Sequence, residues 1–177
     1  MGWAATFRRK WRAFGSYPVR TQALVPVVIL LLALARLAIL TLPFRFYAPV
    51  LGRREAASGD WRMTQSSDDR RSAARIEAIR SAIRASARLV PWNAVCLPQA
   101  LVAAALLRVS GIGYSVHLGV ARGPIDGSGN DHSEEGQSKL NAHAWCVAGG
   151  GVVTGPGALD RFARVAQFVH DPSRSAR

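Results

Sequence analysis

One stretch decides the fold: residues 95–122 read VCLPQALVAAALLRVSGIGYSVHLGVAR. Its first half is rich in Ala and Leu, both strong helix formers, and predicts a helix over about residues 96–109. Gly111 and Gly113 follow, and glycine is the usual residue just past a helix C-terminus. Residues 114–121 then predict a strand. This stretch therefore predicts one helix followed by one strand.

The residues after this stretch predict more strands of the same core. Residues 122–140, RGPIDGSGNDHSEEGQSKL, are expected to form a polar, glycine-rich loop. A second strand is expected over 141–148, and a third begins at 152–154 after three consecutive glycines. We expect a short helix over 158–169 and a tail over 171–177.

The residues before it predict a helical region with many arginines. Residues 52–70 are rich in Gly, Ser, Asp and Arg and are expected to form a loop or linker. A helix follows over about 68–89, with Asp68 and Asp69 at its start, where negative charge suits the helix dipole. Isoleucines 76, 79 and 83 recur at helical spacing, and arginines occupy the other faces. Those arginines form either a solvated face or a docking surface for an acidic partner.

Residues 23–44 form an apolar run long enough for a helix of about 33 Å, which matches the ~30 Å hydrocarbon core of a bilayer. Arg36 interrupts the run, and cations flank it on both sides, so the positive-inside rule gives no orientation. Three placements stay open for this helix: across the inner membrane, at the membrane surface, or buried within a helical domain.

The net charge of +12 is concentrated in the first half of the chain. Residues 1–95 hold 15 Arg and Lys10 against five acids, a net +11, whereas residues 96–177 come to +1. We therefore divide the chain into a basic helical region over 1–90 and a nearly neutral core over 91–170. This asymmetry argues against a uniformly basic nucleic-acid coat, and no recognition motif indicates a nucleic-acid partner. A hydrophobic fraction of 49% excludes a disordered chain.

Cys96 and His143 are the candidate catalytic pair. Cys96 lies in the expected first turn of a helix, where the helix dipole and unpaired N–H groups lower the pKa of a thiol. His143 lies in the strand NAHAWC, residues 141–146, between small residues. With the nucleophile on a helix and the His on a later strand, the imidazole can reach the thiol and act as base and then as acid. Taken alone, each residue could instead belong to the core.

The two cysteines are expected to remain unpaired. Strand alternation places His143 and Trp145 on one face and Cys146 on the other. If His143 points at Cys96, Cys146 points away from it, so we expect two free thiols in the reducing cytoplasm.

No metal site or cofactor is expected. His132 lies in the polar loop with Asp131, Glu134 and Glu135, but without the spacing of a metal site. The sequence also has no glycine-rich phosphate-binding loop, so nucleotide chemistry is not indicated.

Taken together, these motifs resemble the lasso-peptide B2 protein family, the transglutaminase-like cysteine peptidases that remove the leader from lasso-peptide precursors. The matching features are Cys96-Leu97 at the helix start, the apolar helix ending at Gly111, Gly119-Val120, and His143-Ala144-Trp145. The stretch LALARLAILTLPFRFYAPVLG, residues 32–52, also resembles the segment that precedes the peptidase in that family. The resemblance covers roughly residues 24–168. It implies a transglutaminase-like/papain-like α+β core.

The resemblance implies Cys96 as nucleophile and His143 as general base. The family pattern often has an acidic residue about a dozen positions after the His to orient the imidazole, and here that position is Gly155. Asp160 is the nearest acid and a candidate third member of the site. Thr154 or a backbone carbonyl are the alternative partners of the ring N–H.

The remaining site residues follow from their position near Cys96 and His143. The backbone N–H of Cys96 is a candidate oxyanion donor, and the Asn93 side chain either joins it or closes the turn before the helix. Trp92 and Trp145 either wall a substrate cleft or pack in the core.

The function that the resemblance implies is cytoplasmic leader removal during lasso-peptide maturation. The implied partners are the precursor's leader region, a separate leader-binding recognition protein, and an asparagine-synthetase-like macrolactam cyclase that takes up the freed core peptide. Two alternatives stay open. One is a transglutaminase-like amidase that acts on another peptide, and the other is a membrane-associated scaffold in which Cys96 is merely buried.

Overall fold

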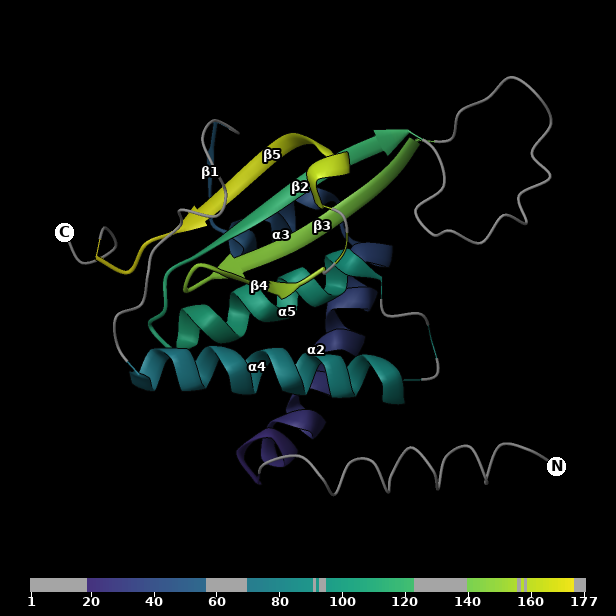
Figure 1. Ribbon diagram of the computed structural model, residues 1–177. Coiled ribbons are helices and arrows are strands. Elements are labelled where there is room, and N and C mark those ends of the chain that lie inside the picture. Colours follow the sequence, from purple (N-terminus) through teal and green to yellow (C-terminus); the bar gives the residue numbers. More distant parts are fainter. Residues whose placement is uncertain are drawn as a thin grey trace, which may run out of the picture.

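The computed structural model describes residues 19–56, 70–90, 92, 95–122, 140–155, 157 and 159–173. They form an α+β fold in which helices cover one face of a five-stranded sheet (Figure 1). The helices are α2 (Val19–Thr41), α3 (Phe44–Leu51), α4 (Arg70–Leu89) and α5 (Cys96–Val109). The strands are β1 (Arg53–Glu55), β2 (Tyr114–Arg122), β3 (Leu140–Ala148), β4 (Gly151–Thr154) and β5 (Ala163–His170).

Helix α5 lies between the other helices and the sheet, and its bounds confirm the predicted helix. Half of its 14 residues are buried, because its many alanines let neighbouring elements approach closely. The helix ends as the glycine pattern predicts. Gly111 adopts a φ of 68°, and the N–H of Ile112 donates to the carbonyl of Leu107 at 3.0 Å.

Helices α2 and α4 pack together and each buries one face. In α4 the isoleucines at 76, 79 and 83 are buried, as their spacing predicts. In α2 the buried face holds Val25, Val28 and Leu32. By length and composition, residues 21–41 of α2 are able to cross a membrane, with a mean hydropathy of 2.7, and only 17% of this stretch is buried. The placement of this helix in the buried centre of a helical domain is therefore wrong.

The apolar run is also broken earlier than its sequence predicts. Helix α2 ends at Thr41, and α3 begins at Phe44 directly after Pro43. Proline has no N–H to donate to the preceding turn, and it disfavours helical geometry in the residue before it. The helix expected over 23–44 is confirmed over 23–41, and its last residues form the break before α3.

The sheet is antiparallel throughout, in the order β1-β5-β2-β3-β4. Strands β2 and β3 confirm the two strands expected over 114–121 and 141–148. Their register places Gly119 opposite His143 and His117 opposite Trp145. Strand β4 pairs with residues 146–148 of β3, and among the described residues no strand pairs with the outer side of the earlier part of β3.

Two predictions for the ends of the sheet are wrong. The helix expected over 158–169 is a short 3-10 helix, Leu159–Arg161, followed by β5. Strand β5 lies between β1 and β2, where both of its edges find backbone partners, and this pairing overrides local helix preference. Residues 53–55 of the expected linker form β1 on the free edge of β5. Residues 57–69, with Asp68 and Asp69, lie outside the described residues.

One hydrophobic core joins the helices to the sheet. It includes Leu32 of α2, Ile83 of α4, Leu107 of α5 and Cys146 of β3. Trp145, Val147 and Leu159 form a smaller cluster. The boundary drawn at residue 90 therefore separates a basic part of the sequence from a nearly neutral part. The large hydrophobic core contains residues from both parts.

Candidate active site

Cys96 is placed by the start of α5. The residue before the helix, Val95, caps it with no side-chain hydrogen bond. The first backbone N–H groups of a helix have no partner within the helix, so those of α5 face outward beside the thiol. Pro98 lacks an N–H and is tolerated in this first turn. The Cys96 side chain is half-buried, which leaves the sulfur accessible.

His143 and Cys96 are brought together at the unpaired outer edge of β3. Burial by itself raises the pKa of the Cys96 thiol. A hydrogen bond with the His143 side chain, bonds from the backbone N–H groups of Ala144 and Leu97, and the charge of His143 outweigh it. The net effect is a pKa of Cys96 below its ordinary value. The thiolate, which is the nucleophilic form, is therefore favoured.

The imidazole shifts in the complementary direction. The hydrogen bond with Cys96 raises the pKa of His143, burial opposes the rise, and a bond to the Gly155 carbonyl adds to it. The distance from Nε2 of His143 to the oxygen of Gly155 is 3.1 Å. Since a carbonyl only accepts, Nε2 carries the proton there, which leaves Nδ1 for exchange with the thiol. The arrangement favours a thiolate–imidazolium pair.

The hydrogen-bond partner that the structure gives to Nε2 of His143 is the Gly155 carbonyl. Asp160 is exposed in the 3-10 helix, five residues beyond Gly155. The hydroxyl oxygen of Thr154, another alternative, is buried and has no hydrogen-bond partner within the described residues. A backbone carbonyl therefore accepts from the imidazole at this site.

Two aromatic rings stack against the imidazole of His143. The ring centroids of His143 and Phe162 are 5.0 Å apart, and those of His143 and Trp145 are 6.0 Å apart, both stacked. His117 stacks on Trp145 at 5.4 Å, is fully buried, and bonds Ser115 at 2.9 Å. Burial, with a smaller contribution from Arg164, lowers the pKa of His117 to about 4, which keeps it neutral near pH 7.

The Gly155 carbonyl is an instance of the backbone partner expected for the ring N–H, whereas sequence reasoning missed Phe162 and His117 as parts of the site. A signal existed for His117, which lies at an alternate position of β2 and faces the same side as its cross-strand neighbour Trp145. No local signal marks Phe162, because its contact with His143 depends on the path of the chain after β4.

The structure also places the expected cleft and oxyanion residues. Trp145 is fully buried, so it packs in the core and does not wall an open cleft. Trp92 is half-buried, and Asn93 lies outside the described residues. The Cys96 N–H, at the first position of α5, belongs to the set that has no partner within the helix. It remains a candidate oxyanion donor.

Cys146 differs from Cys96 in every respect that governs reactivity. Both cysteines are free, as predicted. Cys146 is fully buried in the core on the helix side of the sheet, and this burial raises its pKa. It is therefore a structural residue, and it serves as an internal reference for the chemistry of Cys96.

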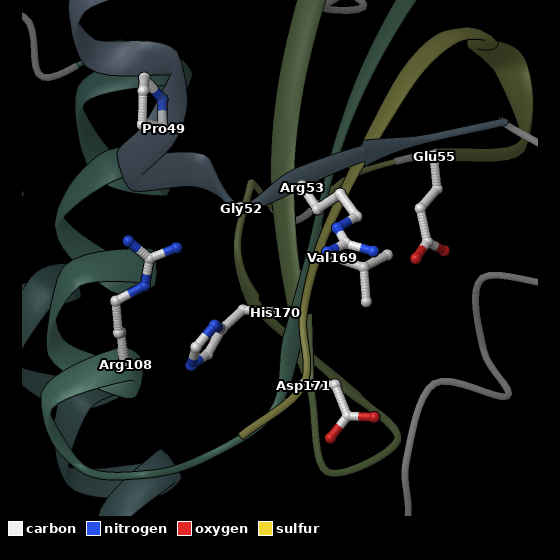
Figure 2. A pocket seen from close by; sticks show the side chains of 8 residues that line it. All are labelled: Pro49, Gly52, Arg53, Glu55, Arg108, Val169, His170 and Asp171. Carbon is white, nitrogen blue, oxygen red and sulfur yellow. The ribbon is translucent and has the colours of Figure 1, made fainter. Parts of the chain in front are cut away.

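A cavity of about 300 Å³ lies away from these residues, between α3, β1, β5 and the end of α5 (Figure 2). Arg108 and His170 face one another in it, with Arg53, Glu55 and Asp171 nearby. Arg108 is twelve residues along α5 from Cys96, or about 18 Å at 1.5 Å per residue. This cavity is therefore separate from the Cys96–His143 pair.

No group of three or more His, Cys, Asp or Glu side chains gathers at metal-binding distance within the described residues. His132 and the acids around it lie outside them.

Comparison with known proteins supplies the family. The model of the transglutaminase-like superfamily, described as Transglut_core3, matches residues 38–167. This span contains Cys96, His143 and Gly155, together with every strand except the last residues of β5. Searches of curated proteins and of solved structures gave no significant match. Since the match covers most of the chain, the protein belongs to the transglutaminase-like superfamily, whose members are generally cysteine hydrolases and transferases.

Proposed function

We propose that this protein is a cysteine peptidase that removes the leader from a lasso-peptide precursor. The observation that carries the proposal is the Cys96–His143 pair, in which the pKa of the thiol is lowered and that of the imidazole is raised. The family supports peptidase or amidase chemistry at this pair. The resemblance to lasso-peptide B2 proteins supports the narrower choice.

The reaction follows from the order of groups around the thiol. The Cys96 thiolate attacks the carbonyl carbon of the last leader residue. The oxyanion that forms lies by the first turn of α5, where the Cys96 N–H donates to it. The carbon–nitrogen bond breaks as His143 gives its proton to the leaving amine, which is the N-terminus of the core peptide. The leader is then held as a thioester.

Hydrolysis restores the enzyme. His143 takes a proton from water, the resulting hydroxide attacks the thioester, and the carbon–sulfur bond breaks to release the leader carboxylate. The Gly155 carbonyl keeps the imidazole aligned through both proton transfers, because it holds Nε2 while Nδ1 exchanges protons. The freed core amine is the group that a macrolactam cyclase consumes.

The proposed partners follow from the same resemblance. The described residues contain no winged-helix unit for leader recognition, so we propose that a separate leader-binding protein presents the precursor. The exposed arginines of α4, such as Arg75 and Arg84, offer a docking surface for it or for an acidic leader.

The test is cleavage of a precursor in the presence of its leader-binding protein, followed by mass spectrometry. We expect Cys96→Ala to lose at least roughly 1,000-fold in rate and His143→Ala at least roughly 100-fold. Cys146→Ala is the matched control, since it removes the other thiol without touching the pair. Cleavage by Cys96→Ala at the parent rate would falsify the mechanism.

The family match also supports a second candidate, an amidase that acts on another peptide. The two candidates differ in substrate and share the thioester. If no precursor is cleaved but an ester or amide model substrate is hydrolysed through Cys96, the amidase is the correct function. If Cys96 reacts with iodoacetamide only after unfolding, both enzymatic candidates fail and a scaffold role stands.

A further inference from the structure

We infer that α2 and α3 form a docking surface for an anionic lipid bilayer, with α2 lying along the membrane surface and not across it. This inference is independent of the catalytic chemistry at Cys96. It is carried by an exposed apolar face, by the charge around that face, and by the packing of α2 on α4.

Exposed apolar side chains run along one side of α2, and further ones follow in α3. On α2, the exposed residues Val27, Leu30, Leu34 and Leu37 recur at spacings of three and four, so they share one side of the helix. Leu37 is 57% exposed and Leu30 is 60% exposed, values unusual for leucines that repeat along one face. Leu40 near the end of α2, Leu42 after it, and Phe44 and Phe46 of α3 are exposed as well. A contiguous apolar patch of this kind marks a binding surface.

The positive charges near this face favour an anionic partner. Among residues 21–54, which the structure describes, Arg36, Arg45, Arg53 and Arg54 are basic and none is acidic. Within the described part, Arg45, Arg53 and Arg54 are exposed at the α3 end of the apolar face. The guanidinium of Arg45 lies 5.0 Å from the ring centroid of Phe46. Apolar and aromatic side chains bordered by cations and without acids are what an anionic bilayer surface binds.

The packing of α2 excludes a spanning position for the folded protein. The opposite face of α2, with Val25, Val28 and Leu32, is buried in the core, and the Ser86 hydroxyl of α4 donates to the Val25 carbonyl at 3.4 Å. If α2 crossed the bilayer with these contacts intact, the exposed arginines of α4 would be drawn into hydrocarbon, where charge is costly. Lying at the surface buries only the exposed face and keeps the core whole.

The surface is tested by flotation of the full chain with vesicles. One set contains equal parts of phosphatidylcholine and phosphatidylglycerol, and the other contains phosphatidylcholine alone. We expect binding to the anionic vesicles, at least roughly tenfold weaker binding to the neutral ones, and weakening with added salt. Equal binding to both sets overturns the role of charge, and absence of binding overturns the surface.

The variants separate the apolar and the charged contributions. Leu30→Gln/Leu37→Gln should weaken binding to anionic vesicles at least roughly tenfold, and Arg45→Gln about fivefold. Val165→Gln is the matched control, because Val165 is also an exposed apolar residue but lies on β5. Circular dichroism verifies that each variant is folded. Unchanged flotation of the double variant contradicts the inference.

Two further measurements exclude other occupants of the face. If the protein is a dimer without vesicles, and Leu30→Gln/Leu37→Gln makes it a monomer that still floats, the face belongs to a second copy and the inference fails. Washing the vesicles with alkaline carbonate should release the parent protein. Retention after the wash would mean that α2 spans the bilayer, which also overturns surface binding.

Discussion

Gly155 sets both the orientation of His143 and the path of the chain beside β3. Its φ of 71° lies in the left-handed region, and a Cβ at this position would overlap the Ala144 carbonyl oxygen and lie 2.9 Å from Cβ of Trp145. Only glycine therefore brings its carbonyl close enough to accept from the imidazole. A carboxylate side chain at this position would require a different backbone.

Gly155→Ala should therefore lower the rate of peptide cleavage by more than the backbone strain of an alanine at this φ alone would explain. We expect a loss of about 100-fold in the rate of peptide cleavage, since misplacing a catalytic group by about 1 Å costs that much. Gly111→Ala is the control, because Gly111 has a similar φ of 68° but open space around it. It should lose about 1 kcal/mol of stability and keep its activity. Cleavage by Gly155→Ala within twofold of the parent would contradict the orienting role.

The pH dependence of Cys96 alkylation tests the ion pair. Against the effect of burial, His143 lowers the pKa of Cys96 and Cys96 raises that of His143, so each group stabilises the charged form of the other. On a Cys146→Ala background, the rate of iodoacetamide labelling should increase with pH. Its midpoint should lie at a lower pH than that of an ordinary thiol. In His143→Ala the midpoint pH of labelling should move upward. Burial still raises the pKa of Cys96 in this variant, and the hydrogen bond and charge of His143 no longer lower it. An unchanged midpoint would exclude the pairing.

At the scale of elements, β1 is held on the sheet by a close approach at Gly52. Its φ is 125°, and a Cβ there would lie 2.7 Å from the Val169 carbonyl oxygen of β5. Gly52→Ala should cost about 2 kcal/mol, or roughly 4–8 °C in Tm, by detaching β1. Gly150→Ala, with a φ of 72° and open space, should lose less.

Activity below the melting transition should survive the Gly52→Ala substitution. Strand β1 is at the opposite edge of the sheet from β4, with β5 and β2 between it and β3. Peptide cleavage at 20 °C therefore measures the site, while thermal unfolding measures the edge. A large loss of cleavage with little change in Tm would mean that β1 acts on Cys96 or His143.

Elements with strong local patterns could be predicted from the sequence. The apolar run and the flanking glycines give the bounds of α5, and alternation gives β2 and β3. Strand β5 and the short β1 could not be predicted, because each becomes a strand through pairing with distant residues. At the site, Cys96 and His143 follow from residue type and order. The Gly155 carbonyl does not, since any residue has one.

At the scale of the whole molecule, the two halves of the chain differ in charge but share one hydrophobic core. Helix α2 comes from the strongly basic half and carries the exposed apolar face, yet its Val28 and Leu32 are fully buried in the core that also holds Cys146. A helix that contributes to this core cannot be detached without unfolding the sheet that positions His143. The apolar face and the catalytic pair thus depend on one folding unit.

Two leucines of α2 provide the test of this unit, because Leu32 is fully buried and Leu34 is 51% exposed. Leu32→Ala should cost about 2–5 kcal/mol, whereas Leu34→Ala should stay within about 0.5 kcal/mol of the parent. Urea unfolding on a Cys96→Ala background is followed by far-ultraviolet circular dichroism for the helices and by thiol titration of Cys146 for the core. In a single folding unit the two signals change together, and Leu32→Ala shifts both equally. If helix is lost at lower urea than Cys146 is exposed, residues 1–90 fold as a separate domain, and the basic region can be removed without loss of the catalytic pair.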